Sequence, residues 1–471
     1  MKTSDSEHLL ETVDYNLRVE KGGKVTVEDA DRLRDTVRHL AAASALGKTD
    51  SLRGWARYLV RAAALELGLV PASIHELYLA RGRDAVPHTF TVPAMNLRAL
   101  PFDAARAVFR VARRMDAGAF IFEIARSEIG YTAQRPSEYV TSILAAAIAE
   151  GYRGPVFIQG DHFQISAKRY AADPESEVQA VRDLIVEALK AGFFNIDVDT
   201  STLVDLSQPT IPRQQALNAR LSAELTAFIR QHEPEGVTVS VGGEIGEVGG
   251  HNSTEEELRA YMDGYRAALG NAVGLSKISV QTGTSHGGIV LPDGSIARVK
   301  VDFDTLHRLS VVARQEYGMG GAVQHGASTL PEEAFGKFVE AQAVEVHLAT
   351  NFQNILYDRL EEDLRAEIYA YLDEHHAHER KPGMTDEQFY YKTRKRALGP
   401  FKERLWNMNP ARREAIAAAW EAQFEKLFTL LGMAGTRQYV EAHIHPPIVP
   451  PRLGDYLGES AAAEDTRDLA D

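Results

Sequence analysis

The chain has 471 residues, 44% of them apolar, which is enough to bury a large core. Lys and Arg number 52 against 66 Asp and Glu, so the net charge of −14 gives nucleic-acid binding little support. Cysteine is absent, which excludes disulfides and thiolate metal ligands, and no apolar run approaches the roughly 18 residues of a membrane span. The N-terminus lacks the basic start and apolar stretch of a signal peptide, so we expect a cytoplasmic protein without membrane contact.

In chain order, residues 29–80 show the apolar spacing of amphipathic helices, and the middle of the chain alternates short apolar runs with helix-sized segments. The runs predict eight strands, over residues 91–96, 119–125, 155–161, 193–199, 237–245, 277–283, 322–325 and 343–350. Eight strands separated by helices are typical of a (β/α)8 TIM barrel. We therefore predict an N-terminal helical extension (1–88), the barrel (89–351), a C-terminal helical extension (352–440) and a tail (441–471).

Three histidines stand where predicted strands end. His162 follows Asp161, His286 lies in Gly283-Thr-Ser-His286, and His325 closes Val323-Gln-His325. Because the carboxyl ends of barrel strands form one rim, these imidazoles are expected to converge and bind a divalent metal with one position open. Any one such histidine alone is more simply interpreted as a capping residue; the three together with Asp161 and Glu244 favour a metal site.

Other polar and small residues mark the same rim. Asn96 and Thr350 end the first and last predicted strands, and Gly287 and Gly326 follow two of the histidines. Glycine lets backbone N–H groups approach an anion, and the last two loops of such barrels often hold phosphate, with Ser328 as a further hydroxyl donor. By contrast, His375, His376 and His378 lie among charged residues of a predicted helix end, which favours a solvated surface.

From Val92-Pro-Ala-Met-Asn96 onward the chain resembles the class II (metal-dependent) fructose-bisphosphate aldolases. Four motifs carry the resemblance, in the family's order: Gly160-Asp161-His162, Gly243-Glu244-Ile-Gly246, Thr284-Ser-His286-Gly287 and Gln324-His325-Gly326-Ala-Ser328. The resemblance implies a lyase of carbohydrate metabolism, of the kind that serves glycolysis. It implies Asp161 as the catalytic acid/base, His162, His286 and His325 as metal ligands, and Glu244 as an alternate ligand.

Zn²⁺ is the first choice of cofactor because imidazole and carboxylate suit it, and Co²⁺, Fe²⁺ or Mn²⁺ fits the same ligands. The resemblance also allows a monovalent cation. The metal would stabilise the enediolate left by carbon–carbon cleavage, while Asp161 takes the hydroxyl proton. Asp199 or Gln159 is expected to orient an imidazole.

Departures from the family concern substrate contacts. The family's last strand ends Asn-x-Asp-Thr, whereas here it reads His347-Leu-Ala-Thr350. The acid that usually follows the Gly-Gly pair is replaced by His251. We therefore predict an aldolase whose anionic ketose is not necessarily fructose 1,6-bisphosphate, with its anionic group between Gly287, Gly326, Ser328 and Thr350 and with His347 in place of the Asn.

The C-terminal extension carries a basic cluster, from Lys392 to Arg404, that is out of keeping with the net charge. In the long-chain branch of the resembling family an equivalent arginine comes from the neighbouring subunit. The resemblance thus implies a homodimer or higher homo-oligomer in which Arg404 grips the distal group of the substrate.

Two other classes of function remain open from the sequence. One is a barrel metalloenzyme of another reaction class, such as an epimerase or hydrolase. The other is a non-catalytic, aldolase-like partner subunit, which the missing family residues suggest and the intact Asp161 and histidines oppose.

Overall fold

The computed structural model describes residues 4–246, 251–283, 291–292, 301–457 and 468–469. Its centre is a closed barrel of eight parallel strands in chain order, in which the last strand pairs with the first, Val346 lying opposite Pro93. The strands are β4 (Val92–Asn96), β5 (Ile121–Ala125), β6 (Gly154–Gln164), β7 (Asn195–Asp199), β8 (Ser240–Glu244), β9 (Lys277–Val280), β10 (Ala322–Gln324) and β11 (Glu345–Leu348). All eight predicted strands are confirmed.

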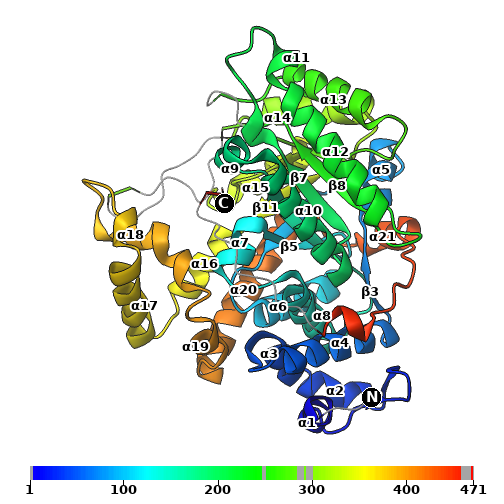
Figure 1. Cartoon of the computed structure of the whole chain (residues 1–471), viewed down its shortest axis with the longest axis vertical. Helices are drawn as coiled ribbons and strands as arrows, with labels where there is room; N and C mark the ends of the chain where they lie inside the picture. Colours follow the sequence, from blue (N-terminus) through cyan, green and yellow to red (C-terminus); the bar gives the residue numbers. More distant parts are fainter. Residues whose placement is uncertain (1–3, 247–250, 284–290, 293–300, 458–467, 470–471) are drawn as a thin grey trace.

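Helices surround the barrel on the outside (Figure 1). Amphipathic spacing forms them: in α6, for example, the apolar residues are buried, whereas the arginines are partly or fully exposed. In chain order they are α6 (Pro101–Arg114), α7 (Arg126–Tyr131), α8 (Pro136–Ala149), α9 (Ala167–Ala172), α10 (Pro174–Ala191), η1 (Ser201–Leu203), α11 (Ile211–Gln214), α12 (Ala216–His232), α13 (Glu255–Leu269), α14 (Phe303–Gln315), η2 (Glu332–Ala334), α15 (Phe335–Glu340) and α16 (Thr350–Tyr357).

The segment before the barrel is less purely helical than predicted. Its helices are α1 (Ser4–Thr12), α2 (Ala30–Thr36), α3 (Arg38–Leu46), α4 (Asp50–Glu66) and α5 (His75–Gly82). A small hairpin, β1 (Leu17–Val19) and β2 (Val25–Val27), precedes α2, and β3 (Leu69–Ala72) pairs in parallel with the start of β6, outside the closed circle. The prediction of helices alone over 29–80 was therefore wrong at β3, a strand too short to show a period.

The segment after the barrel is helical, as expected. It comprises α17 (Glu362–His375), η3 (Ala377–Glu379), α18 (Asp386–Thr393), η4 (Arg394–Ala397), α19 (Lys402–Trp406), α20 (Pro410–Leu430), α21 (Arg437–His443) and η5 (Leu453–Asp455). The long helix α20 packs on α6, where Arg110 pairs with Glu421, whereas α17 and α18 lie to one side of the barrel (Figure 1). None of the described helices is long and apolar enough to cross a membrane.

Candidate active site

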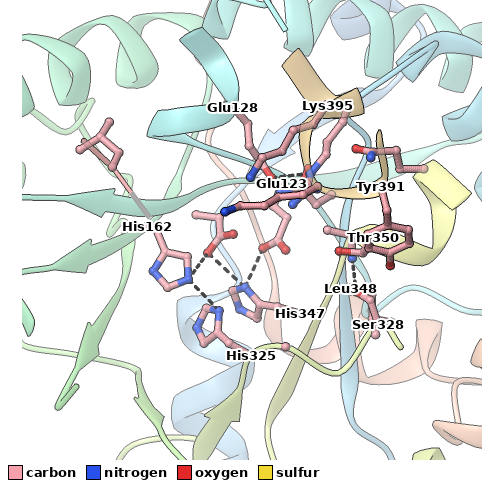
Figure 2. Close-up of a pocket in the computed structure, with 18 of the residues that line it drawn as sticks. Glu123, Glu128, His162, His325, Ser328, His347, Leu348, Thr350, Tyr391 and Lys395 are labelled. Atoms are coloured by element: carbon pink, nitrogen blue, oxygen red, sulfur yellow. Dashed lines mark hydrogen bonds and ion pairs between the residues drawn. The ribbon is translucent and has the colours of Figure 1, made fainter. Parts of the chain in front are cut away.

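A cavity of about 470 Å³ opens at the carboxyl ends of the barrel strands. One end holds histidines and carboxylates of the barrel, and the other is covered by α18 and η4 of the C-terminal extension (Figure 2). Its lining includes Asn96, Arg98, Glu123, Glu128, Asp161, His162, His325, Gly326, Ser328, His347, Thr350, Tyr391, Lys392, Lys395 and Arg396.

Asp161 and His162 both reach this cavity because β6 is irregular between them. Neighbouring strand residues normally point to opposite faces. Here the pairing with β7 steps from Gly160↔Ile196 to Phe163↔Val198, so β6 holds one extra residue, and His162 has a left-handed φ of 39°. Such a bulge re-aims a side chain at a functional site. The strand therefore continues to Gln164 rather than ending at Asp161.

Two of the predicted metal ligands meet directly. Nε2 of His162 lies 3.0 Å from Nδ1 of His325, and the two ring centres are 4.3 Å apart. The other ring nitrogen of His325, Nε2, lies 2.9 Å from the hydroxyl of Ser279 on β9. Both imidazoles are thus held by neighbouring strands, with one nitrogen of each turned toward the other.

Two carboxylates hold the far side of His162. Its Nδ1 lies 3.2 Å from Oδ2 of Asp199 and 3.2 Å from Oε2 of Glu244. Asp199 is itself fixed by Gln164, whose Nε2 donates to Oδ2 at 2.6 Å. Asp199 therefore orients this imidazole, one of the two alternatives that the sequence left open; Gln159 contacts other groups.

His347 on β11 also lies in this cluster. Its ring centre is 4.0 Å from that of His325. Its Nδ1 lies 3.2 Å from Oδ1 of Asp161 and 3.1 Å from Oε2 of Glu123, while Nε2 lies 2.6 Å from Oε1 of Glu345. His347 thus bridges Asp161 to the buried carboxylates below it.

The floor of the site is a buried network of charges. Nζ of Lys277 donates to Glu345 (2.5 Å), to Gln159 (2.7 Å) and to Asp197 (2.9 Å). Gly242 on β8 makes room for it, because a Cβ there would lie 2.2 Å from Oδ1 of Asp197. Sequence reasoning missed Lys277 and Glu345, although a lysine and a glutamate inside apolar strands of a closed barrel are a signal in themselves.

Carboxylates outnumber cations around the histidines, and the pKa values reflect it. Burial together with Asp161 raises the pKa of Glu123, and burial together with Asp199 raises the pKa of Glu244 to about 7. Burial opposes charge on His347, yet Glu123 and Asp161 outweigh it and raise the pKa of that imidazole. Such a negative field favours a bound cation.

The ligand atoms present suit a divalent metal. His162, Glu244 and His325 each offer one, and these three atoms lie within 4.8 Å of one another. Two imidazoles and a carboxylate are a donor set that zinc accepts, and Asp199 supplies the outer carboxylate that such imidazoles usually have. The third predicted histidine, His286, and Gly287 lie outside the described residues.

The predicted substrate contacts lie partly in the cavity. Asn96, Gly326, Ser328, His347 and Thr350 line it, although Oγ of Ser328 already accepts a hydrogen bond from the Ala349 N–H. Arg404 does not line it: it is exposed and pairs with Glu367 at 3.0 Å. Its contribution to a neighbouring subunit's site stays a prediction. Arg98 lines the cavity and was missed, because nothing in the sequence marks an arginine after a strand.

Comparisons with known proteins agree with this architecture. The family model for fructose-bisphosphate aldolase class-II matches residues 81–427. The glycerol-complexed fructuronate-tagaturonate epimerase UxaE from Cohnella laeviribosi is 14% identical, with a TM-score of 0.57 over 89% of this chain and 90% of that one. A probable tagatose 6 phosphate kinase from Sinorhizobium meliloti is 18% identical, with a TM-score of 0.51 over 78% and 96%. No curated protein sequence matches the chain. At these identities the solved structures share the fold.

Proposed function

The chain belongs to the class-II fructose-bisphosphate aldolase family, and from this we propose that it is a metal-dependent lyase that reversibly cleaves a carbon–carbon bond of an anionic ketose. The observation that supports this most directly is the convergence of Asp161 with His162, His325 and Glu244 at one end of the cavity. Aldol cleavage needs a proton acceptor and a group that stabilises the developing negative charge, and a metal centre supplies the second.

When bound, a divalent cation supplies Lewis-acid stabilisation of the negative charge that develops on the ketone fragment. Asp161 takes the proton from the hydroxyl whose carbon becomes the aldehyde, and the electrons of the broken bond stay with the ketone fragment, whose carbon takes up a proton before the ketone is released. His347 holds Asp161 in place through its Nδ1, at 3.2 Å. In the direction of synthesis, Asp161 returns the proton to the new hydroxyl.

A second candidate is an epimerase that works through the same cleavage. The carbon one bond beyond the ketose α-carbon carries no acidic proton, but aldol chemistry can invert it if the bond breaks, the aldehyde turns and the bond reforms. The cover that α18 and η4 place over the cavity would retain an aldehyde for this purpose. The fructuronate-tagaturonate epimerase that shares the fold makes ketohexuronates, which are ketoses with a carboxylate, the substrates to test.

The experiment is a screen of zinc-loaded protein with ketose mono- and bisphosphates and with ketohexuronates, in which free aldehyde and new stereoisomers are both measured. Aldehyde release supports the lyase, and a new stereoisomer without free aldehyde supports the epimerase. Bound metal with neither product points to another reaction class, and protein that holds no metal and yields no product points to a partner subunit. Asp161→Asn and metal-depleted protein are the controls.

A further inference from the structure

The cover of the cavity is strongly basic, unlike its floor. It comes from the segment between residues 384 and 396, which contributes Met384, Gln388, Tyr391, Lys392, Lys395 and Arg396 to the lining. Arg98, from the loop after β4, lies on the same side. In Figure 2, Lys395 and Glu128 stand at the opposite end of the cavity from the three imidazoles, with Glu123 between them.

Two of these cations lie beside one aromatic ring, that of Tyr131 on α7. Nζ of Lys395 lies 5.7 Å from the ring centre, and Cζ of Arg396 lies 5.9 Å from it. Burial raises the pKa of the Tyr131 hydroxyl, and Arg98 is close enough to oppose that rise. The Tyr131 hydroxyl is buried and has no hydrogen-bond partner among the residues that the structure describes. Like charges held this closely repel one another unless an anion lies among them.

Two carboxylates, Glu128 and Glu379, contact these cations directly. Glu128 accepts from Nε of Arg98 at 2.7 Å, and it also accepts from the Asn96 amide and the Ala125 N–H. Glu379 pairs with Nε of Arg396 at 3.3 Å but does not line the cavity. Within the described part of the chain, the two terminal nitrogens of Arg98 have no hydrogen bond, although the residue lines the cavity.

We propose that Arg98, Lys395 and Arg396 form a subsite for a carboxylate or phosphate at the end of the substrate remote from its ketone. A guanidinium with two unused terminal nitrogens can hold either anion by paired hydrogen bonds, and the Lys395 ammonium adds a third donor. This subsite rests on the proposed function for the identity of the substrate, but it binds anions whether or not turnover follows. It lies in the same chain as the imidazoles.

The charge state of Lys395 supports this assignment. Burial, together with the nearby Arg98 and Arg396, lowers the pKa of its ammonium to about 7. An anion bound among the three cations would favour the charged form of this lysine.

Calorimetry with three matched three-carbon probes tests the subsite: glycerol 3-phosphate, glycerate and uncharged glycerol. At pH 6.5 we expect one or both anions to bind at least tenfold more tightly than glycerol. Lys395→Met and Arg98→Lys should each weaken the binding of the anion that the unaltered protein binds more tightly. The expected loss of affinity is about 10- to 100-fold, the contribution of one charge-assisted hydrogen bond. The anion that binds more tightly and responds more to Arg98→Lys identifies the group as phosphate or carboxylate.

Two further variants separate charge from folding and from general surface charge. Lys395→Arg keeps a cation and should keep most of the affinity. Lys381→Met removes an exposed lysine of the same extension, outside the lining, and should bind like the unaltered protein. The proposal is overturned if Lys395→Met and Arg98→Lys bind both anions as tightly as the unaltered protein does. It is also overturned if the unaltered protein binds glycerol as tightly as it binds the anions.

Failure of this subsite and failure of the proposed function give different results. Anion binding that the two variants weaken, in a protein that cleaves no ketose, leaves the subsite standing and removes the lyase. Ketose cleavage with an unchanged KM in Lys395→Met and Arg98→Lys overturns the subsite and leaves the lyase standing.

Discussion

Lys277 and Glu345 form an ion pair at 2.5 Å in which neither side chain has any exposed surface. The pair joins β9 to β11 at the floor of the site, and Glu345 also accepts from His347 at 2.6 Å. Burial alone would raise the pKa of Glu345, but Lys277 and His347 outweigh it and lower that pKa to about 2. The position of the imidazole beside Asp161 thus depends on two charges that no substrate reaches.

Removal of either partner of this pair should destabilise the protein. Lys277→Met leaves the carboxylates of Glu345 and Asp197 buried without their cation, a loss of about 3–5 kcal/mol in the free energy of unfolding. The Lys277→Met/Glu345→Gln double variant should lose less than the sum of the single variants, because each single variant leaves a buried charge unpaired. Urea unfolding measures all three; strictly additive losses would show that the two side chains do not interact.

Asp161→Asn should abolish most turnover and retain the metal. The amide keeps the shape of the side chain but cannot accept a proton, so we expect a loss of about 10²–10⁴-fold in kcat. Asp161 is proposed to carry the proton and not to bind the metal. The metal content of the Asp161→Asn variant, measured by elemental analysis, should therefore equal that of the unaltered protein. Turnover within a few-fold of normal would assign the proton transfer to another residue.

His162→Ala and His325→Ala should each remove most of the bound zinc, since each opens a ligand position in the centre. His376→Ala is the matched control: His376, His378 and Glu379 also bring their ligand atoms within 4.8 Å of one another, but at the surface. Elemental analysis and competition with a chromogenic chelator give stoichiometry and affinity. Zinc that is lost in His376→Ala and kept in His162→Ala would place the ion at the surface group.

Binding of glycerate should weaken as pH rises from 6 to 8. Lys395 is charged below its pKa of about 7 and neutral above it, so the cation that faces the carboxylate is lost across this window. Arg98, Arg396, Glu128 and Glu379 also face Lys395, and the two arginines stay charged throughout. Calorimetry at several pH values gives the affinity for glycerate as a function of pH. This dependence should be weaker in Lys395→Arg, and an equal dependence in that variant would assign the titration to another group.

The sequence predicted the barrel well because most of the strands are short, mainly apolar runs with a polar residue at or soon after the end, and a closed barrel brings those ends together. It therefore placed Asp161, His162, Glu244 and His325 on one rim. It could not place the bulge at His162, which arises from pairing between β6 and β7 and not from any local residue type. Nor could it pair Lys277 with Glu345, because the partners are 68 residues apart and only barrel closure brings them together.

The sequence also could not tell which basic residues of the C-terminal extension line the cavity. In the sequence, the run from Lys392 to Arg404 stands out by its charge, and a guanidinium favours Arg404 as the group that holds the substrate. The structure places Lys395 and Arg396 in the lining and leaves Arg404 exposed. Which residue of a helical segment faces a cavity depends on how that segment docks on the barrel, and a charge run carries no such information.

The most direct test of the proposed chemistry uses ketoses labelled with ¹³C at both carbons of the bond to be broken. A mixture of labelled ketose phosphates and ketohexuronates is followed by NMR with zinc-loaded protein, and with Asp161→Asn as the control. We predict that the one-bond ¹³C–¹³C coupling of one substrate disappears as an aldehyde or its hydrate forms, or that the coupled signals move to those of a new stereoisomer, in both cases only with metal and Asp161. Coupling and stereochemistry that stay unchanged for every substrate, in protein with a full complement of zinc, would contradict the account.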